Sequence, residues 1–213
     1  FQIDGTLGAF DGSTLASQLL IHDFEQSVRG RITRMGGIGA VGTLPEYRGA
    51  GLVRELIIES FARMRDRGIP VSMLRPFKEA YYEKYGYCRA AHSIRLEIPN
   101  SSFYEYLGNT SGDIDFERVP VSDARNPYFD ALRTSFAWVH GRVLSERIND
   151  ASFRERFKNR LFVFFRRESQ VVAMFTYQKE GFLIEGKFTV SDFFWNDRSA
   201  LHAVFSFFAL HRD

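Results

Sequence analysis

The sequence is poor in cysteine, and its charges almost cancel. Its 213 residues contain one cysteine, Cys88, which excludes an internal disulfide and a metal site built from several cysteines. A net charge of +2 gives no reason to expect a nucleic-acid surface. No apolar run approaches the roughly 18 residues of a membrane span, and no signal peptide is visible. We therefore expect a soluble, cytoplasmic protein with no nucleic-acid or membrane partner.

The five histidines show no spacing typical of metal ligands, so no metal site is predicted. They are His22, His92, His140, His202 and His211. We interpret each as structural or exposed, and Cys88 as a small buried hydrophobe. The 22 phenylalanines, by contrast, are many. Several lie in the second half, where large rings favour a core or a subunit contact.

The ends of the sequence indicate a fragment. The chain opens on Phe1 rather than methionine, and it closes on residues that look helical. We expect both ends of the natural protein to lie elsewhere.

The first half reads as hairpins followed by one clear helix. Asp11 and Gly12 predict a turn between two strands, and residues 31–43 predict a further strand. From Leu52 onward, apolar residues recur at helical spacing until Gly68 and Pro70 end the pattern. Further on, the patterns predict strands at 71–77 and 87–98 around a helix at 78–86. The second half is expected to hold helices at 127–139 and 197–211 and strands at 161–168, 170–181 and 182–195.

Two glycine patterns compete for the role of a phosphate site. Residues 37–42, GIGAVG, fit the letters of a dinucleotide-binding turn. That turn needs its third glycine inside the first turn of a helix. Here Gly42 is followed by Thr43, Leu44 and Pro45, and proline disfavours a helical conformation at the residue before it. We therefore reject the NAD-binding interpretation.

The second pattern, RGAG at residues 48–51, directly precedes the predicted helix. A helix start presents backbone N–H groups without intrahelical partners, and the peptide dipoles add positive potential there. Small residues let a phosphate approach those groups closely. Taken alone, the pattern is also compatible with an ordinary turn before a capped helix.

The longer string VGTLPEYRGAGLVREL, with YYEKYGY after it, resembles the GNAT superfamily of acetyl-CoA-dependent N-acetyltransferases. The PEYRGAG loop and the LRPF strand end look like its Eis-like branch, bacterial enzymes that acetylate amines including aminoglycosides. The resemblance implies an α/β (α+β) fold with a mixed, mostly antiparallel sheet flanked by helices. It also implies an acetyl-CoA-binding domain at 1–98, a linker at 99–115 and part of a second GNAT-like domain at 116–213.

The resemblance also implies roles for individual residues. The strand before the loop offers backbone groups to the pantetheine arm, and the loop with the first helical turn wraps the pyrophosphate. The superfamily pattern ends in glycine or alanine where this chain has valine, a departure shared with Eis-like members. The pantetheine residues are then Val41, Gly42 and Thr43, and the pyrophosphate residues are Arg48, Gly49, Ala50, Gly51, Leu52 and Val53.

Acetyl transfer to an amine needs a proton donor for the departing thiolate, and tyrosine is reliably protonated near pH 7. In the family the donor is the tyrosine four residues before the motif's glycine, which is Tyr82 here. Without the resemblance, we interpret Tyr82 as a tyrosine that packs an amphipathic helix against the sheet. Arg75 falls where relatives meet cofactor or substrate, and a plain surface arginine is an equal interpretation.

Three questions stay open in the sequence. The family's base is thought to be the carboxylate of its own C-terminus, in a third domain absent here, so Asp213 is not given that role. The acceptor is an aminoglycoside, a small amine or a lysine side chain, and a homo-hexamer is expected by resemblance alone. A non-catalytic CoA-binding or assembly module is the alternative function.

Overall fold

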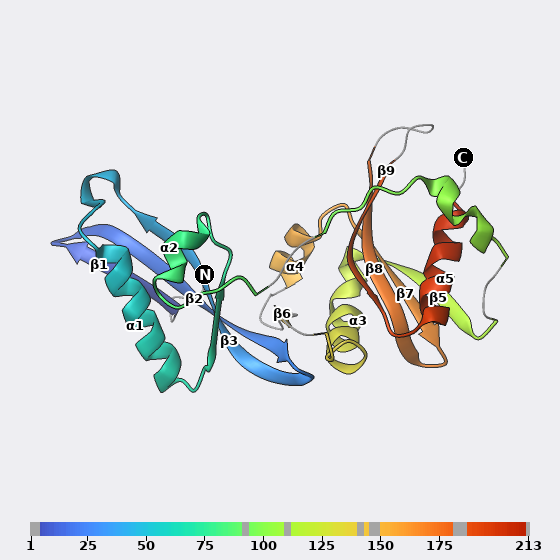
Figure 1. The fold of residues 1–213 in the computed structure, drawn as a ribbon, viewed down its shortest axis with the longest axis horizontal. Coiled ribbons are helices and arrows are strands. Elements are labelled where there is room, and N and C mark those ends of the chain that lie inside the picture. The colour runs from blue at the N-terminus through green and yellow to red at the C-terminus, as the bar shows by residue number, and fades with distance from the viewer. Residues whose placement is uncertain are drawn as a thin grey trace. The chain divides into compact units, whose positions relative to one another are not determined.

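A computed structural model describes residues 5–90, 94–108, 112–139, 143–144, 150–180 and 187–211. The chain divides into two compact units (Figure 1). Unit 1 comprises Phe1–His92 and Val139–Arg147, and unit 2 comprises Ser93–Trp138 and Ile148–Asp213. Both units combine helices with a largely antiparallel sheet, so the expected mixed α/β fold is confirmed. The expected domain limits remain a prediction.

Unit 1 is built on a sheet of strand order β1-β2-β3-β4, with the short strand β6 (Val143–Leu144) also paired to β2. Strands β1 (Thr6–Asp11) and β2 (Thr14–Val28) form an antiparallel hairpin whose tight turn contains Gly12. β3 (Arg31–Thr43) pairs antiparallel with β2, and β4 (Val71–Leu74) pairs parallel with β3. The turn at Gly12 and the strand at 31–43 confirm the sequence predictions.

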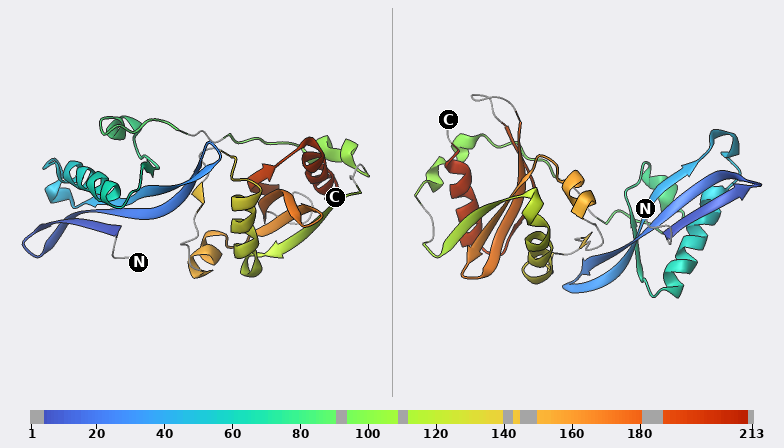
Figure 2. Two further views of the ribbon diagram at one scale, coloured as in Figure 1. Left: turned by 90° about the horizontal axis from the view of Figure 1, so that it is seen from below. Right: turned by 180° about the vertical axis from the view of Figure 1, so that it is seen from behind.

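Helix α1 (Leu52–Asp66) packs its apolar stripe on this sheet. Leu56, Ile57 and Met64 are buried, as the spacing predicts. Glu59 and Arg63, one helical turn apart, form an ion pair on the outer face, with the Arg63 Nε 2.9 Å from the Glu59 Oε1. The short helix α2 (Glu79–Glu83) follows β4, and it lies on the same side of the sheet as α1 (Figure 2).

The strand predicted at 87–98 is wrong for the part that the structure describes. Residues 87–90 and 94–98 pair with no neighbouring strand. The alternating apolar side chains that suggested a strand are exposed instead, with Ile94 84% and Leu96 74% accessible. Cys88 is exposed as well, so its expected burial is also wrong. Alternation indicates a strand only where a partner strand satisfies the backbone.

Unit 2 holds a four-stranded antiparallel sheet of order β5-β7-β8-β9. Its strands are β5 (Ile114–Pro120), β7 (Leu161–Arg167), β8 (Gln170–Glu180) and β9 (Lys187–Trp195). The helices are α3 (Val121–Thr134), α4 (Asp150–Arg156) and α5 (Arg198–Ala209). The 3₁₀ helix η3 (Asn100–Tyr106) also belongs to unit 2, whereas the 3₁₀ helix η2 (Pro45–Tyr47) belongs to unit 1.

The phenylalanine-rich strand β7 is buried on both faces. Phe162 packs against Tyr128 of α3 and Phe153 of α4, with ring centroids 5.4 and 5.7 Å apart. On the other face, Phe165 contacts Phe207 of α5. A strand covered on both sides needs apolar residues at consecutive positions, which explains the run LFVFF. Many phenylalanines of the second half, among them Phe162, Phe165 and Phe207, are therefore core residues, one of the two roles that the sequence predicted.

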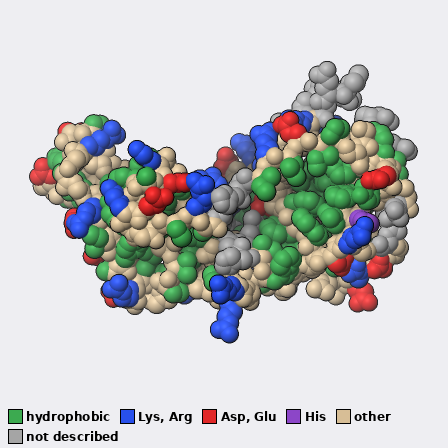
Figure 3. Space-filling model, viewed as in Figure 1, with side chains coloured by type: hydrophobic (Ala, Val, Ile, Leu, Met, Phe, Trp, Pro, Cys, Tyr) green, Lys and Arg blue, Asp and Glu red, His purple; other side chains and the backbone are tan. Residues whose placement is uncertain are grey.

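Part of the aromatic surface of unit 2 stays open. Phe188 and Phe193 of β9 and Phe208 of α5 are only half-buried, and Trp195 is 41% exposed. Hydrophobic side chains gather over these elements in the view of Figure 3.

Several elements of unit 2 differ from the sequence prediction. Helix α3 begins at Val121 rather than at Pro127, because Pro120 supplies the helix start and Pro127 lies inside the second turn. Strand β5 and helix α4 were not predicted. Residues 99–115, expected as a linker, contain η3 and the start of β5.

Candidate functional site

The site predicted around residues 41–53 begins where strands β3 and β4 separate. Their parallel pairing ends at Ile38 and Leu74. Beyond that point, Gly39–Thr43 keep β2 on one side and have no strand partner on the other among the described residues. The pairing with β2 shifts register here, and Ala40 has a φ of +48°. Such a bulge bends the strand and leaves backbone groups unpaired, which suits a ligand that binds along the strand.

Ser17 of β2 fixes the end of β3. Its hydroxyl donates to the Gly42 carbonyl at 3.0 Å and lies 2.8 Å from the Thr43 hydroxyl. Ser17 is 2% exposed, so this contact is shielded from water. No motif in the sequence pointed to Ser17, because its role depends on a partner 25 residues away.

The loop after β3 turns into α1 through two glycines in the left-handed region. Gly49 has a φ of +86° and Gly51, the N-cap of α1, a φ of +80°. This region strains residues that carry a Cβ, so the glycines are required by the backbone. A Cβ built on either glycine meets nothing within 4 Å. The space in front of both residues is therefore open.

The turn presents a row of unused backbone donors. The N–H groups from Gly49 to Val53 donate to no backbone carbonyl in the described part of the chain. The first N–H groups of α1 to be used are those of Arg54 and Glu55, which donate to the Gly51 carbonyl at 2.9 and 3.3 Å. Five consecutive free donors at a helix start, with an exposed arginine at 48, form an arrangement that binds phosphate.

The competing glycine pattern lies in a strand. Residues 37–42 belong to β3, and Gly42 pairs with Gln18 of β2 instead of opening a helix. A dinucleotide-binding turn requires a strand-to-helix turn at these glycines, so their position within a strand agrees with the rejection of that interpretation.

Tyr82 of α2 has a buried ring and a hydroxyl without a partner among the described residues. Its side chain is 5% exposed and belongs to the core cluster that contains Ile38 and Leu56, with Val41 and Val53 packed against it. The hydroxyl makes no hydrogen bond to a described residue, and it is not among the atoms sealed from solvent. Burial raises the pKa of Tyr82, with the charge of Tyr85 adding to the effect, so the phenol stays protonated at neutral pH.

The neighbouring tyrosines differ from Tyr82 in their contacts. Burial raises the pKa of Tyr81 to about 12, with a hydrogen bond to Tyr85 contributing. The Tyr87 hydroxyl lies 2.6 Å from the Ser72 hydroxyl and is thereby occupied. Tyr82 is thus the buried tyrosine of this motif whose hydroxyl is available to a ligand.

The remaining predicted residues do not join this cluster. Arg75 is exposed after the end of β4. His92, His140 and Asp213 lie outside the described residues. Within the described ranges, no group of three or more histidine, cysteine, aspartate or glutamate side chains could hold a metal ion. No described helix is long and apolar enough to span a membrane.

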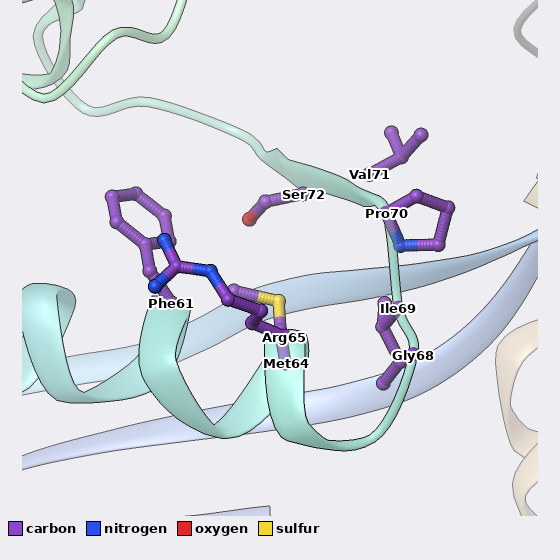
Figure 4. A pocket seen from close by; sticks show the side chains of 8 residues that line it. All are labelled: Phe61, Met64, Arg65, Gly68, Ile69, Pro70, Val71 and Ser72. Carbon is purple, nitrogen blue, oxygen red and sulfur yellow. The ribbon is translucent and has the colours of Figure 1, made fainter.

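A pocket of about 440 Å³ lies at the opposite end of α1 (Figure 4). Its lining includes Phe61, Met64 and Arg65 of α1, Ile69 of the connection, and Val71 and Ser72 of β4. Here the carbonyl end of the helix points outward, which gives a negative potential that disfavours phosphate. The direction of the helix dipole therefore favours the glycine turn over this pocket as a site for an anion.

Residues 1–90 match the family model of the acetyltransferase (GNAT) domain. The matched segment makes up most of unit 1, so the similarity to this acetyltransferase domain concerns unit 1. No curated protein sequence matches the chain.

Solved structures with the same fold cover both units. A GCN5-related N-acetyltransferase from Anabaena variabilis matches 98% of the chain with a TM-score of 0.78 and 22% identity. A conserved protein of unknown function from Enterococcus faecalis, a probable N-acyltransferase, matches 97% at 0.72 and 21%. Eis1 from Mycobacterium abscessus matches 96% at 0.69 and 16%. The chain covers 53%, 52% and 53% of these proteins, so it spans about half their length.

Proposed function

We propose that unit 1 binds acetyl-CoA at the β3–α1 turn and transfers the acetyl group to a primary amine. The observation that carries this proposal is the row of free N–H donors from Gly49 to Val53, in a domain matched to GNAT acetyltransferases. These donors and Arg48 hold the pyrophosphate. The pantetheine arm runs along the open edge of β3 at Val41, Gly42 and Thr43, toward the place where β3 and β4 part.

In this proposal Tyr82 is the general acid. The amine nitrogen attacks the thioester carbon, the C–N bond forms, and the C–S bond breaks. Tyr82 gives its proton to the departing thiolate and is reprotonated from the tetrahedral nitrogen or from water. Its hydroxyl is accessible and its pKa is raised, which suits a donor that must remain protonated between turnovers.

The acceptor class and the assembly belong to the same proposal. Aminoglycosides, small amines and lysine side chains are the candidate acceptors, in keeping with an Eis-like branch. The half-buried aromatic rings of β9 and α5 supply a surface for contacts between copies, and we propose a homo-oligomer, a hexamer by resemblance.

The test is thiol release from acetyl-CoA by the full-length protein with a panel of these amines. Turnover with at least one amine supports an acetyltransferase. CoA binding without turnover on any amine would favour a binding or assembly module instead. Stabilisation by NAD but not by CoA would contradict the proposal. Light scattering at several protein concentrations measures the oligomeric state.

A further inference from the structure

The sheet of unit 1 has a second face, opposite α1, that carries two aromatic rings. Leu19 and Ile21 of β2 point into the core beneath α1. Because side chains alternate along a strand, His22 and Phe24 lie on the opposite face of the sheet from Leu19 and Ile21. Helices α1 and α2 both cover the first face (Figure 2). His22 is exposed and Phe24 is half-buried.

The two rings lie directly over glycines of β3. A Cβ on Gly37 would come within 2.7 Å of the Phe24 ring, and one on Gly39 within 3.2 Å of the His22 Nε2. The rings are parallel to within 1°, with centroids 5.3 Å apart. The glycines thus let both rings lie close to the strand. The His22 imidazole ends beside Gly39, one residue before the bulge at Ala40, where β3 and β4 separate.

The surroundings of His22 leave its imidazole neutral and available. His22 makes no hydrogen bond to another described residue. The ring is partly shielded from water by the strand beneath it, and this desolvation lowers the pKa of His22 below the ordinary value of 6.5, so the neutral form dominates at pH 7. The described side chains nearest to it on this face carry no charge, Arg31 opposite Val28 being farther along the sheet, whereas Asp23 and Glu25 alternate to the other face. The uncharged neighbours are Leu20 and Phe24 on β2, Met35, Gly37 and Gly39 on β3, and Val143 on β6 farther along β2.

We propose that the acceptor amine binds on this face of the sheet and that His22 Nε2 takes the proton that the ammonium must lose. This inference rests on the proposed function. The Phe24 ring offers a surface on which a cation can sit, and His22 lies between that ring and the bulge. Acid and base then approach the reacting atoms from opposite faces, with Tyr82 on the α1 side and His22 on the other.

The proton balance closes without a further reactant. The ammonium gives one proton to His22, directly or through one water, and its nitrogen attacks the thioester carbon. As the C–S bond breaks, Tyr82 protonates the sulfur and recovers a proton from the acetylated nitrogen. His22 returns its proton to solvent. The net reaction releases one proton per acetyl group transferred to an ammonium.

The test compares two acceptors in the wild-type full-length protein and in His22→Asn. One acceptor is an alkyl amine, which is almost fully protonated at neutral pH because its pKa is about 10.4. The other is a hydrazide, whose nitrogen is already unprotonated there. We expect kcat to fall roughly 100-fold for the alkyl amine, the lower range for loss of a general base, and much less for the hydrazide. His202→Asn, on α5 of unit 2, is the matched control and should change neither rate.

The outcomes separate the two proposals. If His22→Asn lowers kcat equally for both acceptors, or for neither, the role of His22 is overturned. Turnover by the wild-type protein would still support the proposed acetyltransferase activity. If wild-type protein turns over no acceptor, the proposed function itself fails. CoA affinity and the unfolding temperature of His22→Asn show whether the variant folds, and His22→Gln replaces it if it does not. In wild-type protein the alkyl amine should also lose kcat/KM as pH falls through a pKa below 6.5, and the absence of that limb contradicts the assignment.

Discussion

Replacing Gly51 by aspartate should weaken the binding of CoA while leaving unit 1 folded. Gly51 is the N-cap of α1, and a Cβ there meets open space rather than protein. The left-handed backbone is tolerated by aspartate and asparagine better than by other residues that carry a Cβ. A carboxylate at a helix start is also favourable for the helix itself. The substitution should therefore affect the binding of CoA far more than the stability of unit 1.

The magnitude follows from the repulsion between the carboxylate and the diphosphate. Two like charges about 4 Å apart repel by about 1 kcal/mol in water and about 4 kcal/mol near a protein surface. An intermediate value of about 2 kcal/mol corresponds to a roughly 30-fold loss of affinity. Titration calorimetry with CoA measures it, and raising the salt concentration should reduce the difference because exposed charges are screened.

Two substitutions serve as controls. Gly51→Asn has the shape of aspartate without its charge, so it should retain most of the affinity. Gly68→Asp lies at the other end of the same helix, where the glycine also has a positive φ (+65°) and open space. Gly68 lines the pocket of Figure 4, so a loss of affinity in Gly68→Asp but not in Gly51→Asp would place the cofactor there and refute the reasoning.

Three further substitutions test the acid, the core and a helix cap. Tyr82→Phe keeps the buried ring and removes the hydroxyl, so kcat should fall roughly 100-fold with CoA affinity unchanged. Because the pKa of Tyr82 is raised, the wild-type enzyme should keep its activity at alkaline pH until above the ordinary tyrosine value near 10, and an earlier decline would contradict the assignment. Ile57→Ala should cost about 2–5 kcal/mol in urea unfolding, whereas the neighbouring Ile58→Ala, at a side chain 44% exposed, should cost far less; equal costs would show that α1 packs differently. Asp197 accepts the Ala200 N–H at 2.8 Å, so Asp197→Ala should cost about 1 kcal/mol at pH 7. In the folded state Arg167 lowers the pKa of Asp197. The stabilisation by the Asp197 carboxylate is therefore present above its unfolded pKa near 3.9 and disappears as pH falls below that value toward the lower folded pKa. If Asp197→Ala cost as much in acid as at pH 7, this explanation would be excluded.

Local signals in the sequence sufficed for much of unit 1. The Asp11-Gly12 turn, the β3 strand and the limits of α1 depend on nearby residues, and all three are observed. The strand at 87–98 was predicted from alternation alone and failed, because a strand also needs a partner that local sequence does not reveal. Strand β5 was missed for a related reason, since turn residues before it obscured a short segment that pairs with β7.

The candidate site divides in the same way. The Gly49 and Gly51 turn was predicted because the glycines and the helix start are adjacent in the sequence. The open edge of β3 could not be predicted, because it depends on where the pairing with β4 stops. The position of His22 beside Gly39 depends on the register between β2 and β3 and on the direction in which the His22 side chain points along the strand. Neither is encoded in a motif.

The most direct test follows the backbone amides of ¹⁵N-labelled protein by NMR while CoA is added. The account predicts that the largest shifts occur at Gly49–Val53, whose N–H groups are free to donate to phosphate, with smaller shifts along Val41–Thr43. Shifts concentrated at Phe61–Ser72, or amides of the glycine turn that remain unmoved at saturation, would contradict it.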